Sequence, residues 1–257
     1  MGEMRGLSGK AAVVTGSSSG IGKAIALRLA SEGVRVVINS RMQGRAQSVA
    51  DELSERGFDA LAVAADIAKP EEAQRLAEAC LERFGRLDIW VNNAGTNAIA
   101  PSIELEADAY RAVIDVNLNG VFFGSQAAGR VMVPQRSGVI IQIGSIFGEV
   151  GMPMRAAYCS AKHGLVGLTK VLASEWAPHG VRVLAVEPAY IRTALDQQDQ
   201  QTGDYSNADI ERRTPMRRYG TVEEVASVVA FAASDEATYL TGISIPVDGG
   251  WIAYGGW

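Results

Sequence analysis

A glycine-rich turn near the amino terminus places the strongest limit on how this chain can fold. It reads Thr15-Gly16-Ser17-Ser18-Ser19-Gly20-Ile21-Gly22, and it joins an apolar run at residues 10–14 to a helical pattern at residues 21–32. Glycines let a diphosphate approach the backbone closely, while the amino terminus of a helix supplies amide donors and a positive dipole. The turn therefore predicts a strand–turn–helix unit that binds a diphosphate. A flexible loop whose glycines serve turn geometry is the alternative.

Strand-like and helix-like stretches alternate along the rest of the chain. We expect further strands at residues 34–38, 60–64, 87–92, 138–143, 181–186 and 243–247, and helices at residues 46–56, 70–84, 107–130, 156–172 and 223–233. Strands buried on both faces between helices are typical of a parallel sheet. We see no internal repeat and no interdomain linker. Residues 1–257 are therefore predicted to form a single doubly wound α/β domain, with a seven-stranded parallel sheet and helices on both faces.

The composition argues against several classes of protein. The 257 residues carry a formal net charge of −5 and no long basic run, so nucleic acid is not an expected partner. Cys80 and Cys159 form no metal-ligand pattern, and they suit a reduced, cytoplasmic compartment better than a disulfide framework. We expect no metal. We also expect no membrane span, since no stretch is long and apolar enough, and residues 1–10 lack the apolar core of a signal peptide.

Tyr158 and Lys162 stand four residues apart in the expected helix at residues 156–172, which places both side chains on one face. An ammonium beside a phenol favours the phenolate and lowers the pKa of the phenol, so Tyr158 can exchange a proton with an alcohol or carbonyl oxygen. A packed aromatic ring and a solvated lysine are the alternative. The glycine-rich turn, and Ser145 just upstream, favour the catalytic interpretation.

The end of the second expected strand bears on the cofactor. In dinucleotide sites, an acidic residue about 20 positions further on binds the ribose 2′-hydroxyl of NAD. Here the strand ends Ile38-Asn39-Ser40-Arg41 and offers no carboxylate. Arg41 can instead pair with the 2′-phosphate of NADP, although it is also readable as an ordinary surface arginine. We therefore predict NADP(H) as the preferred cofactor and leave NAD(H) open.

From Gly9 to Gly250 the chain resembles the short-chain dehydrogenase/reductase family. The resemblance rests on the glycine-rich turn, on Asn-Asn-Ala-Gly at residues 92–95, and on Ser145 with the Tyr-x-x-x-Lys motif, in the family's order. It implies a Rossmann fold and nicotinamide chemistry, with Asp66 against the adenine ring and Thr193 against the nicotinamide carboxamide. The implied cofactor contacts are Gly16, Ser18, Ser19, Gly20, Ile21, Gly22, Ser40, Arg41, Asp66, Ile67, Asn93, Ala94, Gly95, Tyr158, Lys162, Pro188, Ile191 and Thr193.

The same resemblance implies a catalytic set of Asn117, Ser145, Tyr158 and Lys162. Ser145 would hold and polarise the substrate oxygen, and Tyr158 would exchange a proton with it. Lys162 would lower the pKa of Tyr158 and hydrogen-bond the nicotinamide ribose. Asn117 would hold a water that links Lys162 to solvent, with a helix-interior asparagine bonded to the backbone as the alternative.

Two clues to the substrate point in different directions. A polar, glutamine-rich stretch within residues 190–218 predicts a lid over a polar substrate, although a solvated loop has the same composition. A pocket wall is expected at residues 148–155, where Met152 and Met154 suit an apolar group. These clues leave the substrate open.

The overall pattern is similar to the family's sugar, polyol and gluconate dehydrogenases, and to its 3-oxoacyl reductases. A carrier-protein substrate needs a basic rim, for which Arg130 and Arg136 offer little. We therefore expect interconversion of a secondary alcohol and a ketone on a small polar substrate: a polyol, sugar or sugar acid. The alternatives are a 3-oxoacyl-(acyl carrier protein) reductase and a non-catalytic NADP-binding regulatory protein.

Two residues depart from the family pattern. Ala189 stands where the family usually has glycine, so the loop after the strand at residues 181–186 is expected to run slightly differently. Glu187 replaces what is commonly a small residue. It is expected to be a local ion-pair partner, a substrate contact or a partly exposed structural carboxylate.

The assembly is predicted from two segments. The aromatic tail at residues 248–257 is expected to pack against a neighbouring subunit, with packing inside its own chain as the alternative. Ala161, Gly164 and Gly167 permit close approach of a second helix, and the family resemblance implies a homotetramer built as a dimer of dimers.

Overall fold

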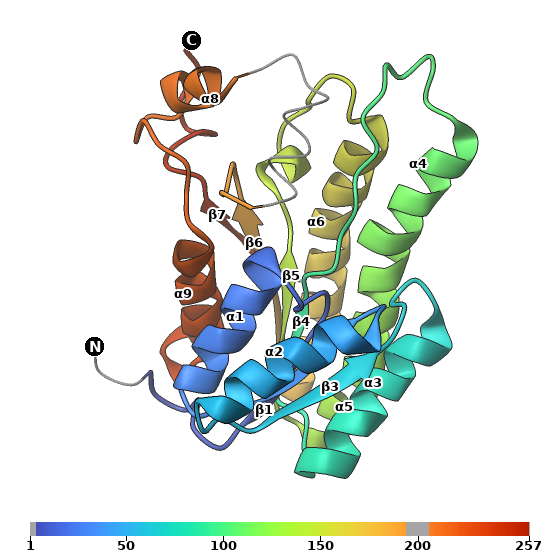
Figure 1. Ribbon diagram of the computed structural model, residues 1–257, viewed down its shortest axis with the longest axis vertical. Helices are drawn as coiled ribbons and strands as arrows, with labels where there is room; N and C mark the ends of the chain where they lie inside the picture. Colours follow the sequence, from blue (N-terminus) through green and yellow to red (C-terminus); the bar gives the residue numbers. More distant parts are fainter. Residues whose placement is uncertain (1–3, 194–205, 257) are drawn as a thin grey trace.

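One parallel sheet forms the centre of the molecule. The computed structural model describes residues 4–193 and 206–256. Within these residues, seven strands pair in parallel in the order β3-β2-β1-β4-β5-β6-β7 (Figure 1). The seven-stranded parallel sheet predicted from the sequence is confirmed. Its strands are β1 (Ala11–Val14), β2 (Arg35–Ser40), β3 (Ala60–Ala64), β4 (Ile89–Asn92), β5 (Gly138–Ile143), β6 (Val181–Pro188) and β7 (Ser244–Val247).

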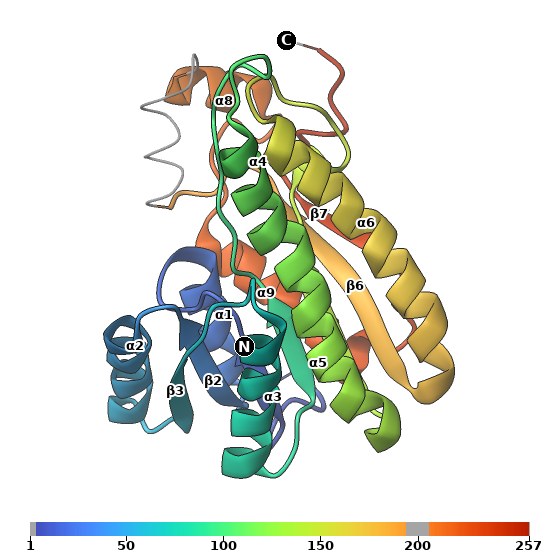
Figure 2. The ribbon, with the colours of Figure 1, turned by 90° about the vertical axis from the view of Figure 1, so that its right-hand side faces the viewer.

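Helices cover both faces of the sheet, as predicted (Figure 2). One layer holds α1 (Gly20–Ser31), α2 (Gln43–Glu55) and α9 (Val222–Ala233). The other holds α3 (Pro70–Phe84), α4 (Ala107–Ile114), α5 (Gly120–Gln135) and α6 (Ala156–Trp176). Successive strand residues face opposite layers, so Val14 packs in the first core and Val13 in the second. None of the helices described is both long enough and apolar enough to cross a membrane.

The helical segments differ from the prediction in two places. The helix expected at residues 107–130 is interrupted by a π-helical turn, η1 (Asp115–Asn119), which apolar periodicity does not reveal. The short, polar α8 (Asn207–Arg213) was not predicted, and a capping box between Ser206 and Asp209 starts it. The described residues also hold three short 3₁₀ helices: η2 (Ile146–Gly148), η3 (Ala177–His179) and η4 (Asp235–Ala237).

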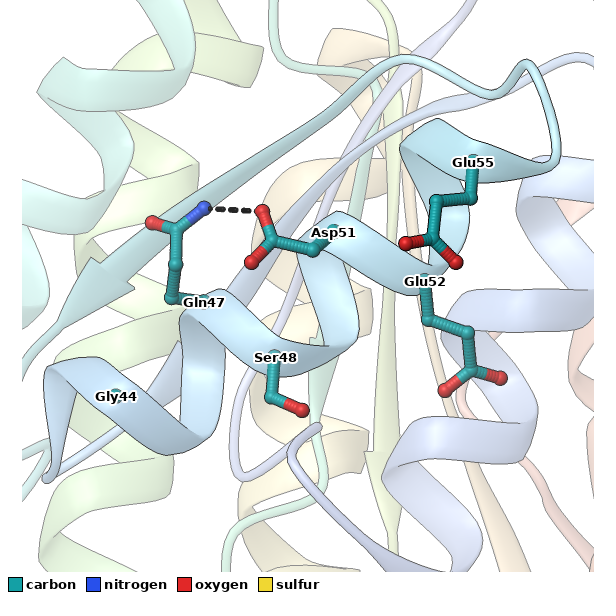
Figure 3. Close-up of a pocket in the computed structure, with 6 residues that line it drawn as sticks. All are labelled: Gly44, Gln47, Ser48, Asp51, Glu52 and Glu55. Carbon is teal, nitrogen blue, oxygen red and sulfur yellow. Dashed lines mark hydrogen bonds between the residues drawn. The ribbon is translucent and has the colours of Figure 1, made fainter.

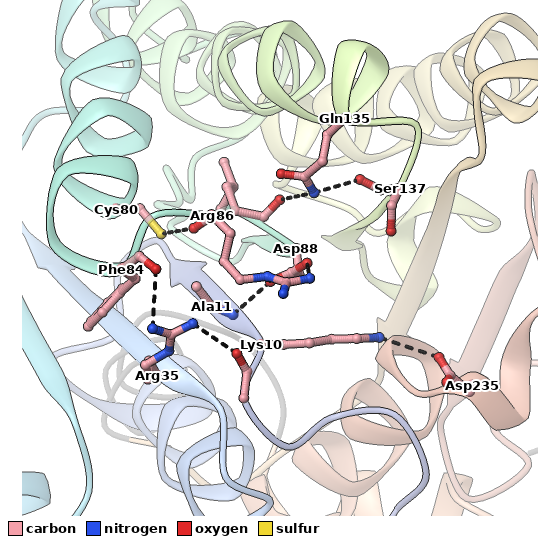
Figure 4. A network of polar contacts seen from close by, with 12 residues as sticks. Lys10, Ala11, Arg35, Cys80, Phe84, Arg86, Asp88, Gln135, Ser137 and Asp235 are labelled. Atoms are coloured by element: carbon pink, nitrogen blue, oxygen red, sulfur yellow. Dashed lines mark hydrogen bonds and ion pairs between the residues drawn. The ribbon is translucent and has the colours of Figure 1, made fainter.

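A polar network holds the amino-terminal edge of the sheet together (Figure 4). Asp88, only 3% exposed, accepts hydrogen bonds from the Ala11 amide at 2.9 Å and from Arg86 Nε at 2.7 Å. Arg86 Nη2 donates to the other carboxylate oxygen, also at 2.7 Å. Nearby, the Arg35 guanidinium donates to the Phe84 carbonyl at 3.1 Å. The starts of neighbouring strands are thus joined by charge-assisted hydrogen bonds.

Candidate active site

A cavity of about 640 Å³ opens at the carboxyl-terminal ends of the strands. All of the predicted cofactor residues line it, from Gly16 in the glycine-rich turn to Thr193 beyond β6, and so does Ser145 after β5. They meet because the carboxyl ends of parallel strands share one edge, and the strand order changes direction there, between β1 and β4. The location of these residues is as predicted, and the contact of each with a bound cofactor stays a prediction.

A second hollow lies on α2 and is a poor candidate (Figure 3). Its lining residues are Gly44, Gln47, Ser48, Asp51, Glu52 and Glu55. Glu52 is already paired with Lys23 at 2.6 Å, and Asp51 accepts a hydrogen bond from Gln47 at 2.8 Å. An acidic groove repels phosphate groups, so we assign the candidate site to the cavity at the sheet edge.

The glycine-rich turn is shaped by the Asn-Asn-Ala-Gly segment that follows β4. The Asn93 side chain donates to the carbonyl oxygens of Thr15 and Gly16 at 2.8 and 3.1 Å. Gly16 has a φ of +61°, and a Cβ there would lie 2.8 Å from the Ala94 Cα, so both conformation and space require glycine. Among the described residues, Ser19 makes no side-chain cap bond to α1, and the first turn of α1 holds no acid. This helix terminus therefore fits a diphosphate.

Sequence reasoning missed two cavity-lining residues, Asn39 near the end of β2 and Arg45 in the first turn of α2. Asn39 Oδ1 accepts from the Gly16 amide at 3.1 Å, so this asparagine braces the glycine-rich turn. Arg45 lines the cavity four residues after Arg41, at the start of α2. Both arginines are exposed, and neither forms an ion pair within the part of the chain that the structure describes. The four-residue spacing of Arg41 and Arg45 was the sequence signal that could have identified Arg45 as a site residue. Two arginines at this place fit a phosphate group.

Lys162 is buried beside the Tyr158 ring. Lys162 is only 5% exposed. Its Nζ donates a hydrogen bond to the Ile143 carbonyl at 2.7 Å and lies 5.5 Å from the centre of the Tyr158 ring. Burial lowers the pKa of Lys162 to about 8, and the charge of Glu187 acts in the opposite direction. Ser145 caps η2, where its Oγ accepts a backbone amide hydrogen bond at 3.2 Å. The cavity therefore brings together a hydroxyl, a phenol and a titratable amine.

Asn117 does not line the cavity. It is fully buried in η1, its Oδ1 accepts from the Thr96 amide at 2.9 Å, and its Nδ2 donates to the Thr96 carbonyl at 2.7 Å. The side chain is thus engaged with backbone groups, as the alternative interpretation of this residue expected. The predicted role of Asn117 in holding a water stays a prediction.

An aromatic cluster borders the cavity. The Phe147 ring packs edge to face against Tyr158, Tyr190 and Trp251, with centroid distances of 6.4, 6.2 and 6.4 Å. Phe147, Tyr158 and Tyr190 line the cavity, and Trp251, which does not line it, packs against Phe147 and Tyr190. Rings in these positions favour a substrate with some apolar surface.

The predicted pocket wall at residues 148–155 differs from the structure in which side chains reach the cavity. Arg155, 4% exposed, lines the cavity, whereas Met152 and Met154 do not. Met154 has a φ of +64°, and its carbonyl accepts from the Ala100 amide at 3.1 Å, so this segment turns to join another loop. The described part of this wall therefore contributes an arginine to the cavity lining, and not the two methionines.

The carboxyl-terminal tail is anchored in its own chain at Trp251. The Arg213 guanidinium lies 4.4 Å from the centre of the Trp251 ring and donates to the Trp251 carbonyl at 3.2 Å. Trp251 therefore packs within its own chain, as the alternative expected, and a contact of the tail with a neighbouring subunit stays a prediction. Trp257 lies outside the described residues, as does the polar stretch at residues 196–204 of the predicted lid.

Glu187 and Ala189 also differ from expectation. Glu187 is 0% exposed and is neither a cavity-lining residue nor a member of an ion pair within residues 4–193 and 206–256. A partly exposed structural carboxylate was one of the three alternatives expected for Glu187, and its complete burial shows that this alternative is wrong. The Ala189 amide donates to the Val247 carbonyl at 3.1 Å, and its φ is not positive, so the strand pairing continues without glycine.

Known proteins resemble this chain over nearly its whole length. A family model described as enoyl-(acyl carrier protein) reductase matches residues 16–252. The 3-oxoacyl-[acyl-carrier-protein] reductase of Synechocystis is 40% identical over 253 residues, which cover 98% of this chain and 100% of that protein. The chain belongs to the short-chain dehydrogenase/reductase family.

Solved structures agree with this family assignment. The gluconate 5-dehydrogenase of Burkholderia cenocepacia, in complex with NADP and tartrate, has a TM-score of 0.93 at 33% identity, and the match covers 98% of each chain. A Beutenbergia cavernae protein, provisionally described as an NAD(P)-dependent gluconate 5-dehydrogenase with NADP at low occupancy, has a TM-score of 0.92 at 41% identity, covering 98% of this chain and 100% of its own. As a short-chain dehydrogenase/reductase, the protein is an oxidoreductase that acts on alcohol or ketone groups with a nucleotide cofactor.

Proposed function

We propose that this protein interconverts a secondary alcohol and a ketone on a small polar substrate, namely a polyol, sugar or sugar acid, with NADP(H). The observation that carries the proposal is the meeting of Ser145, Tyr158 and Lys162 in one cavity with the glycine-rich turn. The exposed arginines Arg41 and Arg45 at the end of β2 support NADP(H) over NAD(H), because a guanidinium binds a 2′-phosphate well.

The mechanism follows from the chemistry of these side chains. When bound, NADP(H) supplies or accepts the hydride. Ser145 donates a hydrogen bond to the substrate oxygen and polarises its bond to carbon, while Tyr158 gives that oxygen a proton during reduction and takes one during oxidation. The Lys162 ammonium favours the phenolate of Tyr158. A water held near Asn117 would connect Lys162 to solvent, and π-helical turns such as η1 are frequent at functional sites.

Within the proposed substrate class, a sugar acid is favoured. Arg155, a buried arginine at the start of α6 and three residues before Tyr158, lines the same cavity. The gluconate dehydrogenases among the similar structures support the same class.

Reduction of a 3-oxoacyl-(acyl carrier protein) is the second candidate. The 40% identical Synechocystis reductase favours it. Arg136, one of two arginines expected at a docking rim, lies just before β5 and therefore at the opposite end of that strand from the cavity. We rank this candidate second for that reason.

We further propose a cytoplasmic homotetramer, with residues 190–218 as a lid over the substrate. Gly167 on α6 is exposed, with open space around it, and so can accept a second helix. Ala161 is buried, and a Cβ on Gly164 would lie 3.0 Å from the Leu118 side chain, so these two serve packing within the chain. Light scattering measures the mass of the assembly, and a monomeric mass would contradict the proposed homotetramer.

Reduced-nicotinamide absorbance tests the proposed function. NADPH and NADH are compared against ketones, ketoses, 3-oxoacyl thioesters and, in reverse, polyols, aldoses and gluconate. We expect turnover with NADPH on a polar substrate, and a loss of at least about 100-fold in Tyr158→Phe with NADPH binding nearly intact. Tight NADPH binding without turnover on any substrate would favour the non-catalytic alternative. A higher specificity constant with NADH would reject the role of Arg41.

A further inference from the structure

Glu187 is a buried carboxyl group that the proposed mechanism does not use. It is 0% exposed near the end of β6, and neither carboxyl oxygen has a hydrogen-bond partner within residues 4–193 and 206–256. An ionised carboxyl in such a place lowers the free energy of unfolding unless another charge compensates it. The neighbours of Glu187 therefore decide what it does.

Three consecutive residues at the end of β5 connect Glu187 with the catalytic centre. The carbonyl of Ile143 accepts the hydrogen bond from Lys162 Nζ at 2.7 Å. Gly144 packs against Glu187, because a Cβ there would lie 2.9 Å from Glu187 Cγ and 3.5 Å from its Oε1. Ser145 then lines the cavity. The carboxyl group thus sits against the same short segment that holds the ammonium of Lys162 and positions the catalytic serine.

The charged and polar groups facing Glu187 come from each element packed around it. Lys162 and His163 belong to α6, Glu149 follows η2, and Ser244 begins β7. Burial has the largest effect on Glu187 and raises its pKa, and the negative charge of Glu149 raises it further. The nearby Ser244 hydroxyl lowers the pKa, although its geometry is not that of a hydrogen bond, and the charges of Lys162 and His163 also lower it. Reciprocally, the charge of Glu187 raises the pKa of Lys162 against the effect of burial.

We propose that Glu187 is a positioning residue that acts through Lys162, as the buried counter-charge that keeps the Lys162 ammonium beside Tyr158 as the pH rises. This inference rests on the proposed alcohol–ketone chemistry. Opposite charges favour each other's ionised forms, so removing the carboxylate lowers the pH at which Lys162 becomes neutral. The enzyme then loses rate on the alkaline side of its pH profile and keeps its rate at lower pH.

Substitutions at one position separate charge from packing. Glu187→Gln removes the charge at nearly constant volume, Glu187→Ala removes charge and volume, and Glu187→Asp keeps the charge. In both neutral variants we expect the alkaline limb of the kcat/KM profile to move down by about one pH unit, a tenfold loss above the limb. Glu187→Asp is expected to keep the limb of the wild type. If the Gln variant does not fold, the Ala variant carries the test.

Glu149→Gln is the matched control, since it removes an exposed carboxylate that faces the same group. Its alkaline limb is expected to stay where the wild type has it. An unmoved limb in the neutral Glu187 variants overturns the inference, and so does an equal shift in Glu149→Gln, because the effect would then be a general one of negative charge.

NADPH binding provides a readout that needs no substrate. Lys162 is proposed to hydrogen-bond the nicotinamide ribose, so the pH at which NADPH affinity falls should shift in Glu187→Gln as the kcat/KM limb does. Protein fluorescence across the neutral and alkaline range measures it. A shifted affinity profile without turnover in the wild type rejects the proposed function alone. Turnover with unshifted profiles rejects the role of Glu187 alone.

Discussion

Two buried carboxyl groups lie at opposite edges of the same sheet, and their surroundings differ. Asp88, 3% exposed, stands just before β4 and accepts hydrogen bonds from the Ala11 amide and the Arg86 guanidinium (Figure 4). Glu187, 0% exposed, stands near the end of β6, and its oxygens have no hydrogen-bond partner among the described residues. The buried carboxyl group at the amino-terminal edge therefore has hydrogen-bond donors, whereas the one at the carboxyl-terminal edge has none among the described residues.

The contrast separates stability from chemistry. The hydrogen bond and charge of Asp88 raise the pKa of Arg86, and the hydrogen bonds of Asp88 to Arg86 and to the Ala11 amide join the strand starts. At the other edge, burial lowers the pKa of Lys162 to about 8 and raises that of Glu187. Groups with shifted pKa values cluster at functional sites, because proton transfer needs groups that titrate near the working pH.

The largest expected effect is on the free energy of unfolding at the amino-terminal edge. Asp88→Ala leaves the buried Ala11 amide unpaired and removes the partner of Arg86, so it should cost about 3 kcal/mol. Glu187→Ala removes a carboxyl whose oxygens accept no hydrogen bond and whose ionisation is opposed by burial, so it should cost clearly less than Asp88→Ala, about 1 kcal/mol. Urea unfolding of both variants measures the difference, and equal losses would contradict the contrast between the two edges.

Lys162→Met is expected to stabilise the protein while abolishing turnover. Because the folded pKa is about 8 and the ordinary value is 10.5, the folded chain must hold a buried ammonium below pH 8. Removing the amine should therefore raise the free energy of unfolding by up to about 3 kcal/mol at neutral pH. The gain should shrink as the pH rises from 8 to 10.5, where the folded-state lysine is already neutral. Urea unfolding at neutral and alkaline pH checks both magnitude and sign, with Lys170→Met, an exposed lysine of the same helix, as control.

Gly144→Ala should destabilise the wild type by about 1 to 2 kcal/mol, because its Cβ would overlap the Glu187 side chain. Most of that cost should disappear in the Glu187→Ala background, because the nearest contact of the new Cβ outside the Glu187 side chain is the Val186 carbonyl at 3.5 Å, an ordinary van der Waals distance. A double-mutant cycle of unfolding free energies measures the coupling. Strictly additive effects would show that Gly144 and Glu187 do not share the space.

The smallest expected effect concerns cofactor affinity. Arg41→Ala and Arg45→Ala should each weaken NADPH binding by about tenfold, or roughly 1.4 kcal/mol, and leave NADH binding unchanged. Both side chains are exposed, so the free energy of unfolding should move by less than about 0.5 kcal/mol. Titration of protein fluorescence with each cofactor provides the comparison. Parallel losses for NADPH and NADH would assign both arginines to something other than the 2′-phosphate.

Local patterns along the chain were enough to predict the parallel sheet, the diphosphate-binding turn and the pairing of Tyr158 with Lys162. Strand and helix periodicity, glycine spacing and an i, i+4 pair are relations between near neighbours, and a parallel sheet brings the carboxyl ends of its strands together whatever lies between them. The positions of all the predicted cofactor residues around one cavity follow from that rule.

Tertiary contacts decided the rest. Asn117 turned toward the Thr96 backbone, Arg155 replaced the methionines in the cavity wall, and Trp251 packed against Phe147 in its own chain. The burial of Glu187 is the clearest case: nothing around it in the sequence distinguishes a buried carboxyl from an exposed one. Burial, and with it the pKa of a group, depends on residues that are distant in the chain, here Gly144 and Lys162, which only folding brings to the end of β6.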